Sequence, residues 1–261
     1  MSRLPSLFVS HGAPTFALEP GLAGPQLAAL GRTLPRPEAV LVVSPHWMTP
    51  SPRVGLAAQP QTIHDFGGFD PALYRIDYPA PGHPRLARQA IQTLNAAGWP
   101  AQADERRGLD HGAWVPLLHL FPQADVPVFQ VSLPSRLDAA SAWAFGEVLA
   151  PLADDGVLVV GSGSLTHNLA EFRGQHGAGE PYVVEFAAWV RGAVIAGDGE
   201  RLRRTLADAP HAARAHPSTE HFWPLLVAAG AAPAQRAWRA IDGGISHGVL
   251  EMDAFIFDAP A

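Results

Sequence analysis

Runs of consecutive apolar residues, without the alternation of a strand that has one wet face, most constrain how this chain can fold. Three of them, "LFV" from residue 7, "VLVV" from residue 40 and "VLVV" from residue 157, are short and are followed by serine or glycine. A strand of this kind is buried on both faces, as in a parallel sheet covered by helices. Helix-like segments separate the runs. The sequence therefore predicts an α/β protein, a three-layer α/β/α domain with a mainly parallel central sheet.

One domain over residues 1–261 accommodates the expected elements, since neither a repeat nor a linker interrupts the pattern. Strands are expected at Leu7–Ser10, Ala39–Ser44, Val126–Ser132, Val157–Gly161, Gln235–Ile241 and Leu250–Phe257. Helices are expected at Pro25–Arg32, Pro84–Ala97, Ala113–Phe121, Asp138–Ala153, Tyr182–Ala196 and Ser218–Ala228.

The composition excludes several kinds of chemistry. The chain has no cysteine and its 18 basic residues are all arginine, which excludes disulfides, thiolate metal sites and lysine Schiff bases. A formal net charge of -6 without a basic stripe argues against a nucleic-acid partner. No apolar run approaches the roughly 18 residues of a membrane span, and no export signal is recognisable. We therefore expect a cytoplasmic protein with no membrane partner.

Histidines follow the ends of three expected strands. His11 comes directly after the first apolar run, His46 lies just beyond the second, and His167 follows the run that ends at Gly161. Because ligands bind beyond the carboxyl ends of strands in open α/β sheets, these imidazoles are expected to converge on one crevice. Neutral imidazole is a common ligand of zinc and iron, so a metal site is favoured over three unrelated loop histidines. His119, among leucines in mid-helix, is instead expected to be a packed residue.

Two later segments supply further candidates. In "HPSTEHFWPLL", Ser218 or Thr219 can cap a helix and put Glu220 and His221 in its first turn, with one of the two facing the crevice. The helix dipole alone also favours an acidic residue there. His111 opens another expected helix in "GLDHGAWVPLL", where a simple helix-start role is equally open.

Seven segments in order along nearly the whole chain carry a family resemblance: "VSHGAPTFAL", "VVSPHW", "TIHDFGGFDPALYRIDYPAPG", "GLDHGAWVPL", "VPVFQVSL", "GSGSLTHNL" and "STEHFWPLL". Together they resemble the class III extradiol ring-cleavage dioxygenases, specifically the DOPA 4,5-dioxygenase branch of the LigB-like family. The resemblance implies that the histidines at the strand ends are metal ligands.

The resemblance also implies a ligand set for one ion. His11 and His46 match the first two ligands, and His221 matches the third in this branch of the family. Glu220 stays a minor candidate for the third position, because more distant relatives use a glutamate there. Fe(2+) is the metal that the resemblance implies for catalysis. Zn(2+) favours the same nitrogen ligands and can occupy such a site without redox chemistry.

Roles in catalysis and substrate binding follow from the same resemblance. His167 matches the catalytic base, and the resemblance also allows it to approach the metal as a fourth ligand in a resting state. His111 matches a histidine that positions or protonates the substrate, and His64, Phe66 and Tyr74 match a segment beside the substrate pocket. Histidine suits such proton transfers because its ordinary pKa lies near neutrality.

The implied activity is cleavage of a DOPA-like catechol by O2 next to its diol, giving a muconic semialdehyde. Catechol and O2 are then the small-molecule partners, and a homo-oligomer is left open. The alternative is a metal-binding member of the superfamily without ring cleavage, acting as an interaction protein or a zinc hydrolase. The aromatic "DFGGFD" loop, with His111 and His167, favours an enzyme that acts on a planar aromatic substrate.

Overall fold

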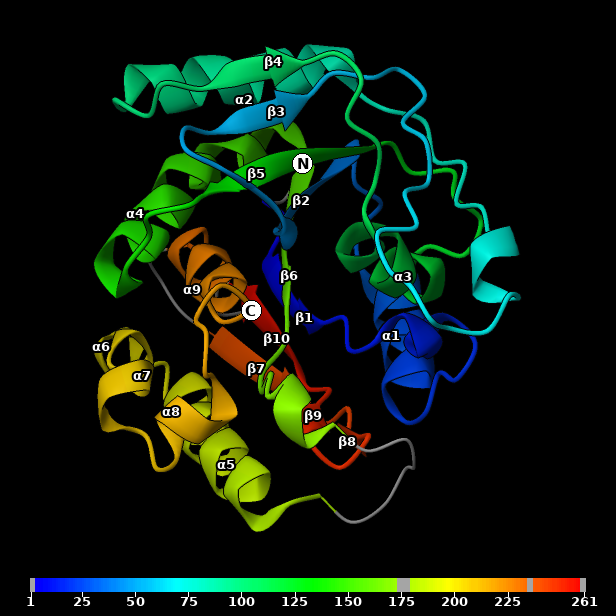
Figure 1. Cartoon of the computed structure of the whole chain (residues 1–261). Helices are drawn as coiled ribbons and strands as arrows, with labels where there is room; N and C mark the ends of the chain where they lie inside the picture. The colour runs from blue at the N-terminus through cyan, green and yellow to red at the C-terminus, as the bar shows by residue number, and fades with distance from the viewer. Residues whose placement is uncertain (1–2, 173–178, 234–236, 259–261) are drawn as a thin grey trace.

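The computed structural model describes residues 3–172, 179–233 and 237–258, and an eight-stranded sheet lies at its centre (Figure 1). The strand order is β4-β3-β5-β2-β6-β1-β10-β7. These strands are β1 Ser6–Ser10, β2 Ala39–Thr49, β3 Arg53–Gly55, β4 Gln102–Asp104, β5 Val128–Pro134, β6 Val157–Gly163, β7 Ala237–Ile241 and β10 Ala254–Asp258. A separate antiparallel pair is formed by β8 Ile245–Ser246 and β9 Leu250–Glu251.

Four parallel strands form the middle of the sheet. β1 pairs with β6, β6 with β2, and β2 with β5, so their carboxyl ends meet at one edge. Their apolar residues are buried without alternation, as the continuous runs predict. The outer strands β10 and β7 are antiparallel, and β3 is antiparallel to β5. The predicted mainly parallel sheet is therefore confirmed.

Helices cover both faces of the sheet, which confirms the three-layer prediction. The helices are α1 Ala23–Thr33, α2 Pro84–Ala96, α3 His111–Leu120, α4 Ala139–Leu149, α5 Pro181–Ile195, α6 Gly199–Arg203, α7 Thr205–Asp208, α8 Ala212–Ala215 and α9 Trp223–Gly230. α9 packs on β6 and β1 with α4 beside it, whereas α3 packs on β2 with α1 against it on the opposite face. None of the helices in the described residues has the length and apolar character needed to cross a membrane.

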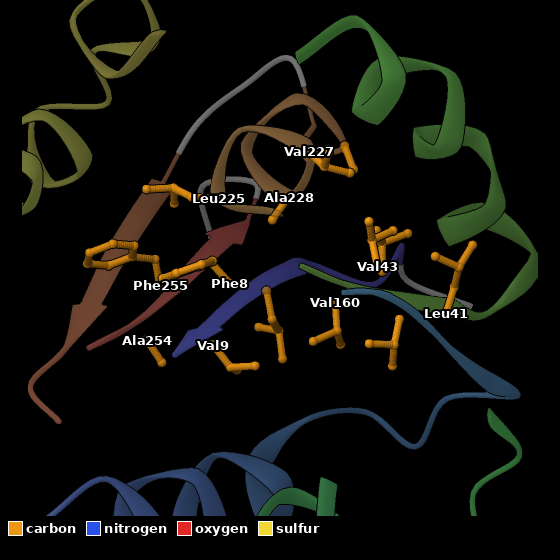
Figure 2. Close-up of a cluster of buried hydrophobic side chains, with 14 of the residues drawn as sticks. Phe8, Val9, Leu41, Val43, Val160, Leu225, Val227, Ala228, Ala254 and Phe255 are labelled. Carbon is orange, nitrogen blue, oxygen red and sulfur yellow. The ribbon is translucent and has the colours of Figure 1, made fainter. Parts of the chain in front are cut away.

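The core closes between α9 and the sheet, as Figure 2 shows. Phe8 and Phe255 lie on the α9 side with their ring centroids 5.7 Å apart, while Val9 and Val160 point to the other face. Successive strand residues point to opposite faces, so both faces need apolar side chains here. Burying each side chain of this size stabilises the fold by about 1.5–3 kcal/mol. The loops at the carboxyl edge of the sheet therefore begin and end on well-packed strands.

One predicted helix begins later than expected. The helix predicted over Ser218–Ala228 starts at Trp223, and the residues before it form turns. The Ser218 hydroxyl donates to the Glu220 carboxylate at 3.0 Å and does not cap the backbone. The helix start moves to the residue before Pro224, whose ring suits a first turn. Glu220 and His221 therefore lie in the turns before the helix, and their predicted place in its first turn is wrong.

The C-terminal strands also differ from the prediction. The strand expected over Leu250–Phe257 is divided into β9, which pairs with β8, and β10, which pairs with β1 and β7. The preceding strand, expected from Gln235, is observed from Ala237, and Gln235 lies outside the described residues. The short elements β3, β4 and α6 to α8 have no clear sequence pattern and were not predicted.

Candidate active site

Five histidines from distant parts of the chain line one cavity at the carboxyl edge of the parallel strands. His11 follows β1, His46 lies in β2, His111 begins α3, His167 lies in the loop after β6, and His221 lies just before α9. The cavity has a volume of about 360 Å³. The structure thus brings together the three strand-end histidines with the two candidates from the later segments.

A neighbouring strand orients His11. Its Nδ1 lies 3.0 Å from the Ser162 hydroxyl, which itself donates to the carbonyl oxygen of Gly112. Because the serine hydrogen is used on that carbonyl, Nδ1 must donate, and Nε2 keeps its lone pair. Burial lowers the pKa of His11 well below its ordinary value, and His46 adds to the shift. A neutral imidazole with a free ring nitrogen is the form that binds a metal ion.

His46 reaches the cavity through an irregularity in β2. The register between β2 and β5 shifts between Ser44 and Met48, and His46 lies in this bulge. A bulge re-aims a side chain that a regular strand would send to one face of the sheet. Nε2 of His46 lies 3.1 Å from Nε2 of His11. Burial lowers the pKa of His46 to about 4, so its ring is neutral at pH 7.

Glycine is required where α3 and the first strand approach the site. A Cβ atom at Gly112, in the first turn of α3, would overlap the Ser44 hydroxyl and lie 3.0 Å from Cδ2 of His46. Gly12, directly after His11, has a φ of +61°, which favours glycine. Gly112 thus lets α3 approach His46 closely, and Gly12 lets the backbone turn directly after His11.

Glu220 and His221 have different positions in the site. Oε1 of Glu220 accepts a hydrogen bond from Nδ1 of His221 at 3.1 Å. The remaining ring nitrogen of His221, Nε2, is buried and has no hydrogen-bond partner among the described residues. Burial lowers the pKa of His221 to about 3, and the hydrogen bond from His221 lowers that of Glu220 to about 2. A carboxylate behind a histidine in this way is typical of metal sites.

The imidazoles of His11, His46 and His221 fit a metal ion. Their ring centroids form a nearly equilateral triangle with sides of 5.0, 5.1 and 5.4 Å. Two nitrogens on one tetrahedral ion lie roughly 3.4 Å apart when each bond is about 2.1 Å, close to the 3.1 Å between His11 and His46. The unpartnered Nε2 of His221 carries a desolvation cost that a metal bond would offset. Among the described residues, these three histidines therefore form a group that could hold one metal ion.

Asp65 is a site residue that sequence reasoning missed. Its Oδ1 accepts hydrogen bonds from the backbone N–H and from Nδ1 of His111, at 2.9 and 3.0 Å. Its Oδ2 lies 3.8 Å from Nδ1 of His46. Burial acts to raise the pKa of Asp65, but the hydrogen bonds from His111 outweigh it and lower the pKa to about 2. The "HDFGG" motif contains this aspartate, but nothing in the sequence pairs it with a histidine 46 residues away.

His167 stacks on one of the three ligand candidates. The rings of His167 and His221 lie 3.5 Å apart between centroids, at an interplanar angle of 10°. The backbone N–H of His167 donates to the Ala215 carbonyl at 2.8 Å, which ties the loop after β6 to α8. Burial lowers the pKa of His167, an effect that Glu220 partly opposes. The ring is therefore neutral at pH 7.

Apolar and aromatic side chains form the rest of the cavity wall. They are Ala13, Pro14, Phe66, Phe69, Leu169, Phe172 and Leu250. His64 and Tyr74 lie behind Phe66, with ring centroids 5.8 and 5.1 Å from it, and do not line the cavity. Nε2 of His64 bonds to the Ile76 carbonyl at 3.0 Å. Among the three predicted substrate contacts, Phe66 is therefore the one in the wall, and the other two support it from behind.

Known proteins resemble this chain over nearly its full length. The family model described as the catalytic LigB subunit of aromatic ring-opening dioxygenase matches residues 24–247. Two relatives named 4,5-DOPA dioxygenase extradiol, from Beta vulgaris and Escherichia coli (strain K12), are each 39% identical to it. These matches cover 97% and 96% of this chain, and 96% and 93% of the respective relatives.

A solved structure agrees with the fold. The crystal structure of an uncharacterized protein from Escherichia coli K12 is similar with a TM-score of 0.79 and 30% sequence identity, over 97% of this chain and 99% of that one. The resemblance indicated by the sequence motifs is confirmed, and a metal-binding protein without ring cleavage is not favoured. The chain therefore belongs to the LigB family of aromatic ring-opening dioxygenases, as an extradiol enzyme.

Proposed function

We propose that this protein uses O2 to cleave the ring of a DOPA-like catechol next to its two hydroxyl groups. One carbon–carbon bond beside the diol breaks, both oxygen atoms enter the product, and a muconic semialdehyde forms. The observation that carries the proposal is a cavity with an aromatic wall in which three imidazoles that could hold a metal ion meet two further histidines. The names of the relatives support the substrate class.

His11, His46 and His221 would hold the metal ion, and we propose Fe(2+) for catalysis. When bound, Fe(2+) supplies the redox chemistry that lets a catechol and O2 react, whereas Zn(2+) in the same site has none. Three protein ligands leave coordination positions open for small molecules. The hydrogen bonds from His11 to Ser162 and from His221 to Glu220 keep both Nε2 atoms available in the cavity.

His167 is the base in this proposal. Its neutral ring can accept a hydroxyl proton from a catechol in the cavity and return it later. The stacking on His221 favours this role over a fourth ligand position. Two imidazoles that bind one ion direct their nitrogens at the same point, whereas parallel rings direct theirs along parallel lines.

His111 and the aromatic wall hold the substrate in this proposal. The ring centroid of His111 lies 3.9 Å from that of His46, which supports a contact with the second catechol oxygen. Phe66 and Phe172 offer apolar surface to the aromatic ring. Phe172 is itself supported by stacking on His247, at 4.3 Å between centroids. A dry, aromatic wall keeps water from the reacting oxygens.

Oxygen consumption tests the proposed function. Purified protein is loaded with Fe(2+) without air, mixed with DOPA and a panel of other catechols, and followed with an oxygen electrode and by the absorbance of the yellow product. We expect one O2 consumed per catechol, and none when the same protein is loaded with Zn(2+). An iron-loaded protein that leaves every catechol intact would exclude the proposal. The cytoplasmic location and a homo-oligomer stay predictions.

A further inference from the structure

We propose that Asp65 is a positioning residue, which holds His111 in the tautomer that meets the substrate. The inference rests on the proposed role of His111 and adds a residue to the site. It starts from the loop that joins β3 to the aromatic wall, where Asp65 directly precedes Phe66.

The distances show which histidine Asp65 acts on. Both hydrogen bonds of its Oδ1 go to His111, at 2.9 Å from the backbone N–H and 3.0 Å from Nδ1. Its Oδ2 lies 3.8 Å from Nδ1 of His46, beyond hydrogen-bonding range. Asp65 therefore acts through His111.

The contact decides which nitrogen of His111 is free. An ionised carboxylate can only accept hydrogen bonds, so Nδ1 of His111 carries the hydrogen and Nε2 keeps a lone pair. His111 lines the cavity, whereas Asp65 does not. Nε2 can then accept the proton of the second catechol hydroxyl and give it back. The carboxylate holds the ring and stabilises the charged form that exists between these two steps, as in other carboxylate–histidine pairs.

The contact between Asp65 and His111 also connects His111 to the aromatic wall of the cavity. The ring of Phe66 meets that of His111 edge-to-face, with centroids 5.7 Å apart. The hydrogen bond from the His111 backbone N–H therefore fixes the loop to the first residue of α3. The helix has its own cap, because the Asp110 side chain accepts from the Ala113 N–H. Loss of the Asp65 carboxylate should thus leave α3 folded.

The tautomer of His111 can be measured without turnover. In Zn(2+)-loaded protein with 15N-labelled histidine, we expect the NMR spectrum to show the His111 hydrogen on Nδ1. Asp65→Ala should shift His111 toward the Nε2–H form while the metal content stays at one ion per chain. A His111 tautomer that is the same in both proteins would overturn the proposal. This result does not depend on whether any catechol is cleaved, so it separates this inference from the proposed function.

Kinetics with Fe(2+)-loaded protein test the consequence. Asp65→Ala should lower kcat roughly 10- to 100-fold, the effect of losing a partner that orients an active-site histidine, with little change in KM. Asp65→Asn, which keeps an acceptor oxygen, should recover part of the rate. In a His111→Ala background, Asp65→Ala should cost little more, because both changes remove the same contact. An equal further loss in that background would contradict the proposal.

Asp70→Asn is the matched control from the same loop. Its Oδ1 accepts a hydrogen bond from the Ala72 N–H at 2.7 Å, and it does not line the cavity. We expect wild-type kcat and KM in this variant. A comparable loss of kcat in Asp70→Asn would show that Asp65 matters only for the shape of the loop, and would overturn the positioning role.

Discussion

At the scale of single residues, one hydrogen bond at Nδ1 leaves a lone pair on Nε2 in both His11 and His221. Replacing either of these, or His46, by alanine removes one of the three proposed ligands, so we expect the metal content to fall to a small fraction of one ion per chain. His119→Ala is the control, because Nε2 of His119 bonds to the Phe16 carbonyl away from the cavity. Metal analysis after equal loading with Zn(2+) checks this. Equal metal content in all four variants would rule out the ligand assignment.

Replacing His167 distinguishes its two possible roles, as a metal ligand or as the catalytic base. We expect His167→Ala to keep its metal and to bind catechol, since the three proposed ligand imidazoles remain. Its turnover should fall roughly 100- to 10,000-fold, the range that general acid–base catalysis contributes. Metal analysis of the variant measures its metal content, and oxygen uptake by the same preparation measures its turnover. If the variant loses its metal, His167 is a ligand and His111 becomes the leading candidate for the base.

At the scale of elements, the site depends on how closely α3 approaches β2. Gly112→Ala adds a methyl group that must overlap the Ser44 hydroxyl and push against His46. We expect about 1–3 kcal/mol of lost stability, as for other overpacked cores, together with weaker metal binding. Gly67→Ala is the control, because a Cβ there meets nothing within 4 Å. Urea denaturation and Zn(2+) titration measure the two effects, and wild-type values for Gly112→Ala would refute the packing argument.

The sequence predicts the elements better than it predicts their contacts. Buried strands leave a local pattern, so the strand ends and the histidines that follow them are predictable. The bulge that re-aims His46 and the two groups that orient histidines leave no such pattern. Ser162 is 151 residues from His11, and Asp65 is 46 residues from His111. Only the folded sheet brings these partners together.

At the scale of the whole molecule, buried neutral histidines make the metal-free protein sensitive to acid. Burial lowers the pKa of His216 and His46 to about 4 and that of His221 to about 3, and it lowers that of His11 as well. In the unfolded chain these rings titrate near 6.5. Their contribution to stability is therefore complete above pH 6.5 and is lost as the pH falls toward 4, by about 3 kcal/mol for His216 alone.

Urea denaturation of the metal-free protein at pH 7.5, 6.5 and 5.5 measures this loss. Burial raises the pKa of Glu251 to about 9, so this residue makes the folded protein more stable as the pH falls. It is a single group, however, and the four histidines together lose more stability than it gains. We expect stability to decrease over this range. His216→Gln, whose amide can still donate to the Leu165 carbonyl, should show a weaker dependence. A stability that stays constant from pH 7.5 to 5.5 would contradict the argument.

The central position of β1 has a consequence for biosynthesis. This strand is translated well before β6 and β10, yet it lies between them in the sheet (Figure 1). His221 follows His11 by about 210 residues, which takes roughly 10–40 s at the usual rate of translation. Once His46 has been made, the nascent chain carries two of the three proposed ligands and still lacks His221. The proposed metal site can therefore be complete only late in synthesis, close to the point at which β10 can close the sheet.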